Sequence, residues 1–272
     1  MILLHSVESQ SSFEFIKQLE GCRKGQSVNG LHKMKQYLKQ FGYIKMREYD
    51  DQFDPLLESA IRNYQQNYNL NVTGTLHPDT VNQMMMPRCG VKDVANTTTT
   101  NSGSSGLQFH HVSRYKFFPG NPKWPPERHH LTYNFKSSAN VPGSNQDISA
   151  VCSRAFKTWS EVTNFTFEEV GENAKADIVI GFHHGDHGDG LPFDGPKGVV
   201  AHAFTAVDGR IHYDADEKWS LLKDPARDEM DLETIAVHEV GHVIGLDHSS
   251  EKESVMFATI GFGTIKREIA FR

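Results

Sequence analysis

The chain of 272 residues has few cysteines, no long apolar run and no excess of basic residues. Its 3 cysteines cannot form a closed set of disulfide pairs, which excludes a disulfide-stabilised scaffold. No stretch of the sequence is apolar for long enough to span a bilayer. With 28 Lys and Arg against 34 Asp and Glu, the net charge is -6, so we expect no nucleic acid partner. The composition is otherwise that of a globular protein with one large or two small domains.

A polar segment divides the chain. Residues 96–106 consist only of Asn, Thr, Ser and Gly and show no hydrophobic periodicity. Such a segment cannot bury a face, which is typical of a flexible connection. We therefore expect a linker over residues 94–106, with one domain before it in residues 1–93 and another after it in residues 107–272.

The first domain is predicted to be a small unit of three helices. Leu31, Met34 and Leu38 recur at helical spacing. Two further helices are expected to begin at Pro55 and Pro78, because proline is favoured in the first turn of a helix.

The second domain mixes strands and helices. A helix is expected near residues 148–162, and strands are expected at residues 131–135, 165–170, 177–182, 199–204 and 211–213. Because most strands precede a second helix late in the domain, the order predicts an α+β fold.

That late helix contains the most informative stretch, His-Glu-Val-Gly-His-Val-Ile-Gly-Leu-Asp-His, which begins at His238. On a helix, His238 and His242 project from one face and can bind one metal ion. Glu239 lies beside them and can take a proton from a metal-bound water. Gly245 can adopt a left-handed backbone and end the helix, which would bring His248 to the same ion. Three protein ligands leave one position open, so the spacing predicts a hydrolytic zinc site.

The alternative is a buried helix whose histidines serve only packing. The segment is apolar on two faces, but packing requires neither three histidines nor a glycine at these offsets. Met256 follows in Ser-Val-Met-Phe and resembles the Met-turn beneath the zinc of metzincins. We therefore favour a zinc-dependent protease.

A second motif, Pro87–Asp93, reads Pro-Arg-Cys-Gly-Val-Lys-Asp. It resembles the cysteine switch of matrix metalloproteinase zymogens, although Lys92 stands where that family usually has proline. The resemblance implies that Cys89 binds the catalytic zinc and keeps the enzyme latent. A thiolate is a strong zinc ligand, and the adjacent Arg88 is expected to favour loss of the thiol proton. The alternative, a free cysteine in a loop, is favoured only where such a motif stands alone.

The region between the two motifs resembles the His-rich loop of matrix metalloproteinase catalytic domains. The resemblance implies a structural zinc site with a closed tetrahedral ligand set, made of His187, Asp189, His202 and His212. It also implies one calcium site, since calcium prefers oxygen ligands, at Asp194, Gly195, Asp214 and Glu217. A His-rich polar loop without metal is the alternative reading.

The same resemblance implies that Val200 and Ala201 lie on an edge strand that binds an extended peptide substrate by backbone pairing. It covers the chain from about residue 21 to residue 266 and is closest to the plant matrix metalloproteinases. The fold that it implies is a metzincin catalytic domain, with a mixed twisted sheet and long helices, after a peptidoglycan-binding-like prodomain. We expect the catalytic domain to lack the family's final helix, and the amino terminus to be incomplete or an alternative start.

Together these features predict a secreted, monomeric zinc endopeptidase, made as a zymogen and acting on extracellular proteins or peptides. Glycosylation sequons at Asn71, Asn96 and Asn164 also favour the outside of the cell. The resemblance further implies cleavage on the amino side of a hydrophobic residue. One alternative is a catalytically impaired zinc- and calcium-binding module, or a truncated form, that acts through interactions. Another is a metzincin of a different branch, which would lack the Pro-Arg-Cys-Gly motif.

Overall fold

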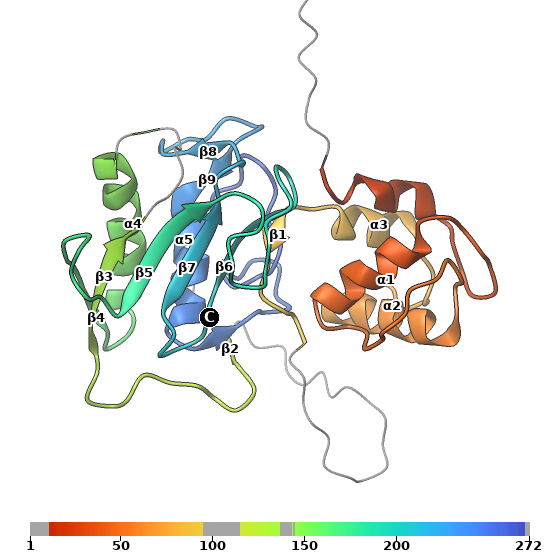
Figure 1. Ribbon diagram of the computed structural model, residues 1–272, viewed down its shortest axis with the longest axis horizontal. Helices are drawn as coiled ribbons and strands as arrows, with labels where there is room; N and C mark the ends of the chain where they lie inside the picture. The colour runs from red at the N-terminus through yellow and green to blue at the C-terminus, as the bar shows by residue number, and fades with distance from the viewer. Residues whose placement is uncertain (1–10, 95–114, 137–142, 144, 270–272) are drawn as a thin grey trace, which may run out of the picture.

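The computed structural model describes residues 11–94, 115–136, 143 and 145–269. A helical unit and a unit built on a six-stranded sheet lie side by side (Figure 1). The expected linker lies outside the described residues except for Val94, and so does the sequon at Asn96. Across the described part of the chain, every helix is too short or too polar to cross a membrane.

The helical unit confirms the three expected helices and adds a short 3-10 helix before them. Its elements are η1 (Glu14–Leu19), α1 (Leu31–Gln40), α2 (Pro55–Asn67) and α3 (Pro78–Met84). The α2 helix begins where expected because Asp54 caps it, accepting a hydrogen bond of 2.7 Å from the backbone N–H of Leu57. Leu31, Met34 and Leu38 are fully buried in the core between the helices.

The second unit is built on a mixed sheet with the strand order β1-β6-β7-β5-β3-β4. The strands are β1 (Arg88–Cys89), β3 (His130–Phe135), β4 (Thr166–Glu169), β5 (Ile178–His183), β6 (Val199–Ala203) and β7 (Arg210–Asp214). Only the β6–β7 pair is antiparallel among the pairings within this sheet. The five strands predicted in this unit are present, whereas β1 was not expected.

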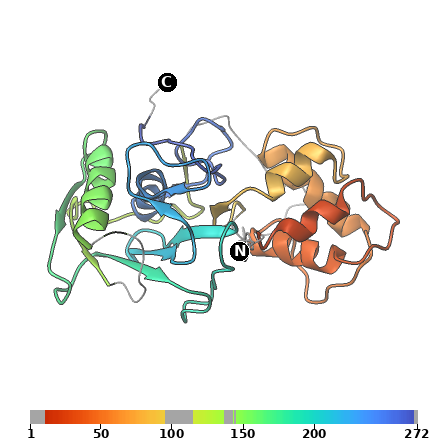
Figure 2. The ribbon, with the colours of Figure 1, turned by 90° about the horizontal axis from the view of Figure 1, so that it is seen from above.

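Two helices cover one face of this sheet. They are α4 (Asn145–Ser160) and α5 (Leu232–Val243), and Figures 1 and 2 place both on the same side of the strands. Two small sheets complete the unit and consist of β2 (Lys116–Phe117) with β10 (Leu246–Asp247), and β8 (Trp219–Ser220) with β9 (Met230–Asp231).

Aromatic side chains hold the helices to the sheet and to each other. Phe156 on α4 stacks on Tyr133 of β3 with ring centroids 4.1 Å apart. Trp159 on α4 donates a hydrogen bond of 2.7 Å to the backbone carbonyl of Val237 on α5. These contacts hold α4 against the sheet and α5 against α4. The predicted α+β fold is confirmed.

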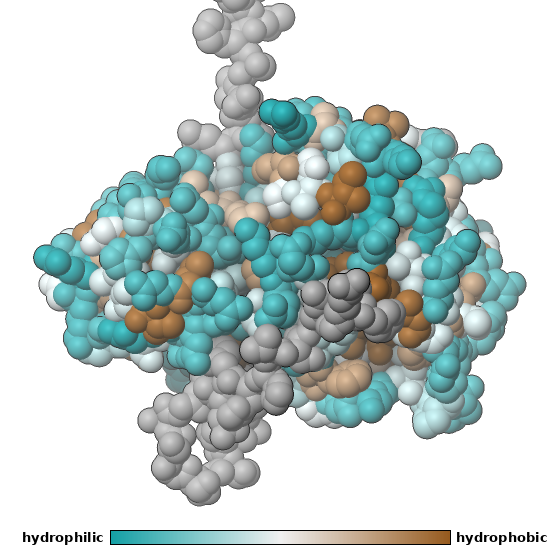
Figure 3. Space-filling model, turned by 180° about the vertical axis from the view of Figure 1, so that it is seen from behind, coloured by the Kyte–Doolittle hydropathy of each residue, from teal (hydrophilic) through white to brown (hydrophobic). Residues whose placement is uncertain are grey.

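The segment that follows α3 joins the second unit as an extra strand. Arg88 and Cys89 pair in parallel with Val199 and Ala201 of β6, so β1 lies at the edge of the sheet. Seen from behind, the outer surface of both units is largely hydrophilic, with apolar residues in separate spots where grey atoms do not cover it (Figure 3). Phe193, Val199, Phe257 and Ala258 of the second unit are buried in one cluster with the core of the helical unit.

Candidate metal centres and active site

The α5 helix and the turn after it position three histidines. His238 and His242 lie one turn apart, and their ring centroids are 4.7 Å from each other. The helix ends before Gly245, whose φ of +113° lies in the left-handed region, and a Cβ there would approach the carbonyl oxygen of Pro122 to 3.0 Å. The chain therefore turns sharply and places the ring of His248 4.8 Å from that of His242.

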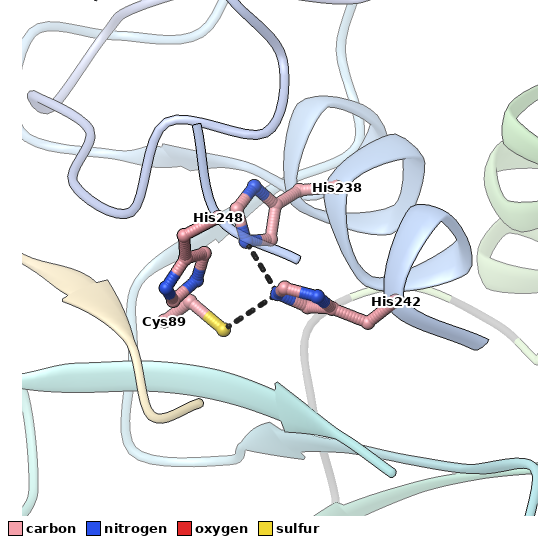
Figure 4. A group of neighbouring side chains, drawn as sticks. All are labelled: Cys89, His238, His242 and His248. Atoms are coloured by element: carbon pink, nitrogen blue, oxygen red, sulfur yellow. Dashed lines mark hydrogen bonds between the residues drawn. The ribbon is translucent and has the colours of Figure 1, made fainter. Parts of the chain in front are cut away.

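The ligand atoms of Cys89 and the three histidines converge on one point (Figure 4). The Nε2 atoms of His238 and His242 are 3.1 Å apart, and Cys89 Sγ lies 3.5 Å from His242 Nε2. In a tetrahedral zinc site with ordinary bond lengths, such N–N and S–N edges measure about 3.3 and about 3.6 Å. The four residues therefore fit a zinc ion.

The hydrogen bonds of the rings support the same conclusion. His238 Nδ1 lies 2.7 Å from the carbonyl oxygen of Val255, and His242 Nδ1 lies 2.8 Å from that of Leu246. A carbonyl can only accept, so both Nδ1 atoms carry the hydrogen and both Nε2 atoms present lone pairs. Burial lowers the pKa of His238 to about 3, which keeps its ring neutral. Two lone pairs that face each other at 3.1 Å repel unless a cation lies between them.

The third histidine is oriented by a carboxylate from the segment that contains β1. Asp93 Oδ1 accepts hydrogen bonds from His248 Nδ1 at 2.9 Å and from Arg88 at 2.7 Å. Its Oδ2 accepts from the hydroxyls of Tyr43 at 2.7 Å and Tyr68 at 3.1 Å. Burial opposes ionisation, but the Arg88 charge and the bond from His248 hold the pKa of Asp93 well below its ordinary value. The His248 Nε2 atom is buried without a hydrogen-bond partner among the described residues, as expected of a metal ligand.

The charge of Arg88 favours loss of the Cys89 proton, as expected, but other groups outweigh its effect. The Arg88 guanidinium pairs with Asp93 and lies 3.4 Å above the ring of Phe41, so its direct contacts are with these groups and not with the thiol. Burial, together with the nearby Glu239 carboxyl, raises the pKa of the Cys89 thiol well above its ordinary value. Ionisation of this thiol therefore depends on a metal ion rather than on the neighbouring arginine.

Backbone contacts hold the thiol in place. Cys89 N–H donates to the carbonyl of Ala258 at 2.9 Å, and Gly90 N–H donates to that of Ala201 at 2.8 Å. A Cβ on Gly90 would lie 2.8 Å from a methyl of Val199, so only glycine allows this close approach to β6. The strand with Val200 and Ala201, expected to bind substrate, is thus paired with the backbone of β1.

Glu239 lies beside the histidines and is fully buried. Neither of its carboxyl oxygens has a hydrogen-bond partner within the described residues, and burial raises its pKa to about 8. Met256 lies under this part of α5, because a Cβ on Gly241 would come within 2.4 Å of its sulfur. An unpartnered carboxyl next to a metal-binding cluster is poised to bind a water or to exchange a proton.

The four residues of the expected structural site also come together. One oxygen of Asp189 lies 2.8 Å from His187 Nε2, 2.7 Å from His202 Nε2 and 2.8 Å from His212 Nδ1. Burial lowers the pKa of His202 and of His212 to about 4, so both rings are neutral. Three imidazoles with one carboxylate form a closed set that fits a structural zinc.

The expected calcium ligands are less tightly gathered. In each of the two clusters above, the ligand atoms lie within 4.8 Å of one another. Among the described residues, Asp194, Asp214 and Glu217 do not form a third cluster of this kind. Burial and mutual repulsion nevertheless raise the pKa of Asp214 to about 6 and that of Glu217 to about 7, and Asp194 contributes to both. One oxygen of Asp214 is buried without a partner there, and Gly195 turns the chain with a φ of +82°. A cation would relieve this crowding of negative charge.

A pocket opens beside the first cluster. Residues of α5 and β6 and the segment 255–260 line it, together with Cys89 and Lys266. Sequence patterns gave no role to Lys266, and none to the contact between Asp93 and His248. Both features depend on segments distant in sequence, so no local spacing could have revealed them.

Converging imidazoles next to a buried, unpartnered carboxyl define the class of protein, which is a metal-dependent hydrolase. The profile of the Matrixin peptidase family matches residues 123–269, and that of a peptidoglycan binding domain matches residues 27–84. The chain belongs to the matrixin family, and it is a metalloendopeptidase.

Named relatives agree with this assignment. Metalloendoproteinase 5-MMP of Arabidopsis thaliana is 42% identical over 270 residues, which cover 96% of this chain and 74% of the relative. Metalloendoproteinase 1 of Glycine max is 42% identical over 252 residues, covering 90% of this chain and 80% of the relative. Matrix metalloproteinase-16 of Homo sapiens is 39% identical over 209 residues, covering 74% of this chain and 32% of the relative.

Proposed function

We propose that this protein is a latent zinc endopeptidase in which Cys89 is the inhibitory zinc ligand. The observation that carries the proposal is the position of Cys89 Sγ, 3.5 Å from His242 Nε2 and in one cluster with the three histidines. His238, His242 and His248 would hold the zinc, and Cys89 would fill the position that a water needs. When bound, the zinc supplies a Lewis acid that polarises a carbonyl and acidifies water.

The residues of this chain perform the remaining steps. As a carboxylate, Glu239 takes a proton from the water while the water oxygen bonds to the peptide carbonyl carbon, and it then delivers that proton to the amide nitrogen as the C–N bond breaks. The positive charge of a bound zinc would favour this ionised form of Glu239, whose pKa burial otherwise raises to about 8. The carboxyl ends the cycle as it began, so water is the only reactant consumed besides the peptide. The β6 edge at Val200 and Ala201, now paired with β1, pairs with the substrate backbone once the prodomain leaves.

Latency ends when the prodomain is removed or when the thiol is modified. Residues 1–93 supply both Cys89 and Asp93, so cleavage after them frees the zinc position and the Nδ1 of His248 together. We further propose that His187, Asp189, His202 and His212 hold a structural zinc ion. Asp194, Gly195, Asp214 and Glu217 are proposed to hold calcium.

The setting that we propose is extracellular, with protein or peptide substrates cut before a hydrophobic residue, and a monomeric enzyme. The described sequons agree with this setting, because both Asn71 and Asn164 are exposed and open to glycosylation.

The test is cleavage of a quenched fluorescent peptide before and after prodomain removal. The intact zymogen should be silent, and the processed protein should cleave the peptide and lose activity to a zinc chelator. Glu239→Gln should lose activity by about 10²–10⁴-fold, the range for removal of a general base, and should retain its zinc. A processed, zinc-loaded and folded wild type without cleavage would refute the proposal, as would full activity of Glu239→Gln.

A further inference from the structure

The turn that carries the third histidine of the first cluster contains the short strand β10. The Leu246 carbonyl in this strand accepts a hydrogen bond of 2.8 Å from Nδ1 of His242. The next residue, Asp247, accepts a hydrogen bond of 2.8 Å from the backbone N–H of His248 on its Oδ1. Both contacts fix residues of the proposed zinc site, and both come from β10. The position of this strand therefore affects two of the three histidines.

The partner of β10 is β2, which comes from a distant part of the chain. The two strands form a small antiparallel sheet of their own, in which Lys116 lies opposite Asp247 and Phe117 lies opposite Leu246. A pair of strands this short is at best marginally stable by itself. Side-chain contacts must therefore add to the pairing.

Other residues that follow β2 pack against the end of α5. Trp124 is buried, and its indole N–H donates a hydrogen bond of 2.9 Å to the backbone carbonyl of Val243. The ring centroid of Phe118 lies 5.5 Å from that of His242. Residues 116–124 therefore lie along the end of the metal-binding helix and the turn after it.

A charged pair joins β2 to this turn. The Lys116 ammonium lies 3.0 Å from Oδ2 of Asp247, whose side chain is 2% exposed, whereas the side chain of Lys116 is 49% exposed. A buried carboxylate is costly unless a cation compensates its charge. Among the described residues, Lys116 is the one that forms an ion pair with Asp247. The pair therefore holds the side chain that accepts from the N–H of His248.

We propose that Lys116 is a positioning residue for the metal centre, because through Asp247 it holds the turn that presents His248. The inference rests on the proposed zinc site and deepens it by naming what supports the third ligand after processing. In the zymogen, Asp93 also bonds to His248 Nδ1, at 2.9 Å. Processing removes Asp93 with residues 1–93, whereas Lys116 follows the expected linker and stays. Lys116 therefore matters more in the processed enzyme than in the zymogen.

The experiment measures how fast zinc passes from the processed protein to an excess of a coloured chelator. His242→Ala, which lacks one ligand, identifies the phase of release that belongs to the histidine cluster. Lys116→Met should speed up this phase about tenfold, at the lower end of the range for loss of a group behind a metal ligand, because solvent screens a half-exposed charge. Release in any other phase should not change, and the effect should be smaller in the intact zymogen.

Two further variants distinguish the charge pair from a general loss of packing. Lys116→Arg keeps the charge and should retain the wild-type rate. Asp247→Asn keeps an acceptor for the N–H of His248 but needs no cation, so Lys116→Met should add little to it in a double-mutant cycle. Additive effects of the two substitutions overturn the inference, and so does an unchanged rate of release from processed Lys116→Met.

Lys123→Met is the matched control. Lys123 is an exposed cation of the same segment, and its ammonium lies 5.4 Å from the ring centroid of Phe117. This variant should release zinc at the wild-type rate. Equal acceleration in Lys123→Met and Lys116→Met overturns the inference, because the effect would then come from the charge of the segment as a whole.

Zinc content and peptide cleavage separate this inference from the proposed function. A wild type that holds zinc at the histidines without cleaving, and loses it faster as Lys116→Met, refutes the catalytic proposal and supports the role of Lys116. Cleavage by a wild type whose zinc release equals that of Lys116→Met refutes only the role of Lys116. A wild type without zinc at the histidines refutes both.

Discussion

Among single residues, Asp93 connects the prodomain to the catalytic cluster most directly. It is buried and contacts four groups, which are Arg88, His248 and the hydroxyls of two tyrosines. A carboxylate that accepts from the Nδ1–H of a metal-binding histidine fixes the ring and makes the other nitrogen a better ligand. The segment 88–93 therefore reaches the histidine cluster at two points, through the thiol of Cys89 and through the carboxylate of Asp93.

Asp93→Asn should weaken both contacts with the histidine cluster, the one through the Cys89 thiol and the one through the carboxylate. The amide keeps the size of the side chain but loses the charge that pairs with Arg88, and breaking a buried pair costs about 3–5 kcal/mol. Loss of a partner behind a metal ligand typically weakens metal binding about 10–100-fold. We expect the intact zymogen to show peptidase activity without processing and to release zinc faster to a chelator.

The matched control for this prediction is Tyr43→Phe, which removes one hydrogen bond to Asp93 and touches neither Arg88 nor His248. If both variants release zinc at the same rate, the carboxylate has no special role at the metal centre.

Sequence spacing was informative at the residue scale only where ligands share one local segment. His238, His242 and His248 lie within one helix and turn, so their offsets alone predict convergence. Cys89 lies far away in sequence, and its proximity to them was predicted from a family resemblance. The pairing of Arg88 with Asp93 rather than with the thiol follows from tertiary packing, which the adjacent positions of Arg88 and Cys89 in the sequence do not reveal.

Among the elements, α5 carries the cluster, and its packing leaves no free space at Gly241. Glycine within a helix normally costs about 1 kcal/mol relative to alanine, so a change such as Gly241→Ala would stabilise a solvent-exposed helix. Here the new methyl would meet the sulfur of Met256 and the ring of Trp159, at 2.4 and 2.9 Å. Overpacking of a core costs about 1–3 kcal/mol, so the clash outweighs the helix propensity.

We therefore expect Gly241→Ala to lower the free energy of unfolding by up to about 2 kcal/mol, from the clash less the propensity gain. Chemical denaturation of the processed domain measures it. The double variant with Met256→Ala should recover part of the loss caused by the methyl group, because the sulfur is then absent. Additive effects of the two substitutions would show that Gly241 and Met256 are not packed against each other.

The elements that sequence periodicity predicted are the long ones. The helix expected at residues 148–162 is α4, at Asn145–Ser160. The bounds of the five expected strands also lie close to the observed bounds. The two-residue strands β1, β2, β8, β9 and β10 were not expected, because their pairing partners determine them rather than their own side chains. The short helix η1 also lacked a clear hydrophobic period.

At the scale of the whole molecule, the prodomain also touches the expected calcium region. Ser12 donates a hydrogen bond of 2.5 Å to Asp194, and Ser11 donates one of 2.5 Å to the carbonyl of Lys197. Removal of the prodomain takes these donors away and leaves the crowded carboxyls of Asp194, Asp214 and Glu217 with fewer partners.

Calcium should therefore stabilise the processed domain. A ligand at a concentration of 100 times its Kd adds about 2.7 kcal/mol to the free energy of unfolding. We expect the Tm of the processed domain to rise as calcium is added, and Glu217→Gln to reduce that rise. Magnesium serves as the control cation, because it is smaller and demands a stricter geometry. Equal Tm values with and without calcium would contradict a calcium site here.

The most direct test of the central claim is zinc-edge X-ray absorption of the intact zymogen. With two zinc ions bound, Cys89 should contribute one sulfur per two zincs at about 2.3 Å, among nitrogen and oxygen ligands at about 2.0–2.2 Å. Cys89→Ser should abolish the sulfur signal and keep the zinc content. A wild-type zymogen that binds zinc without any sulfur neighbour would contradict the account, because its latency would then need another cause.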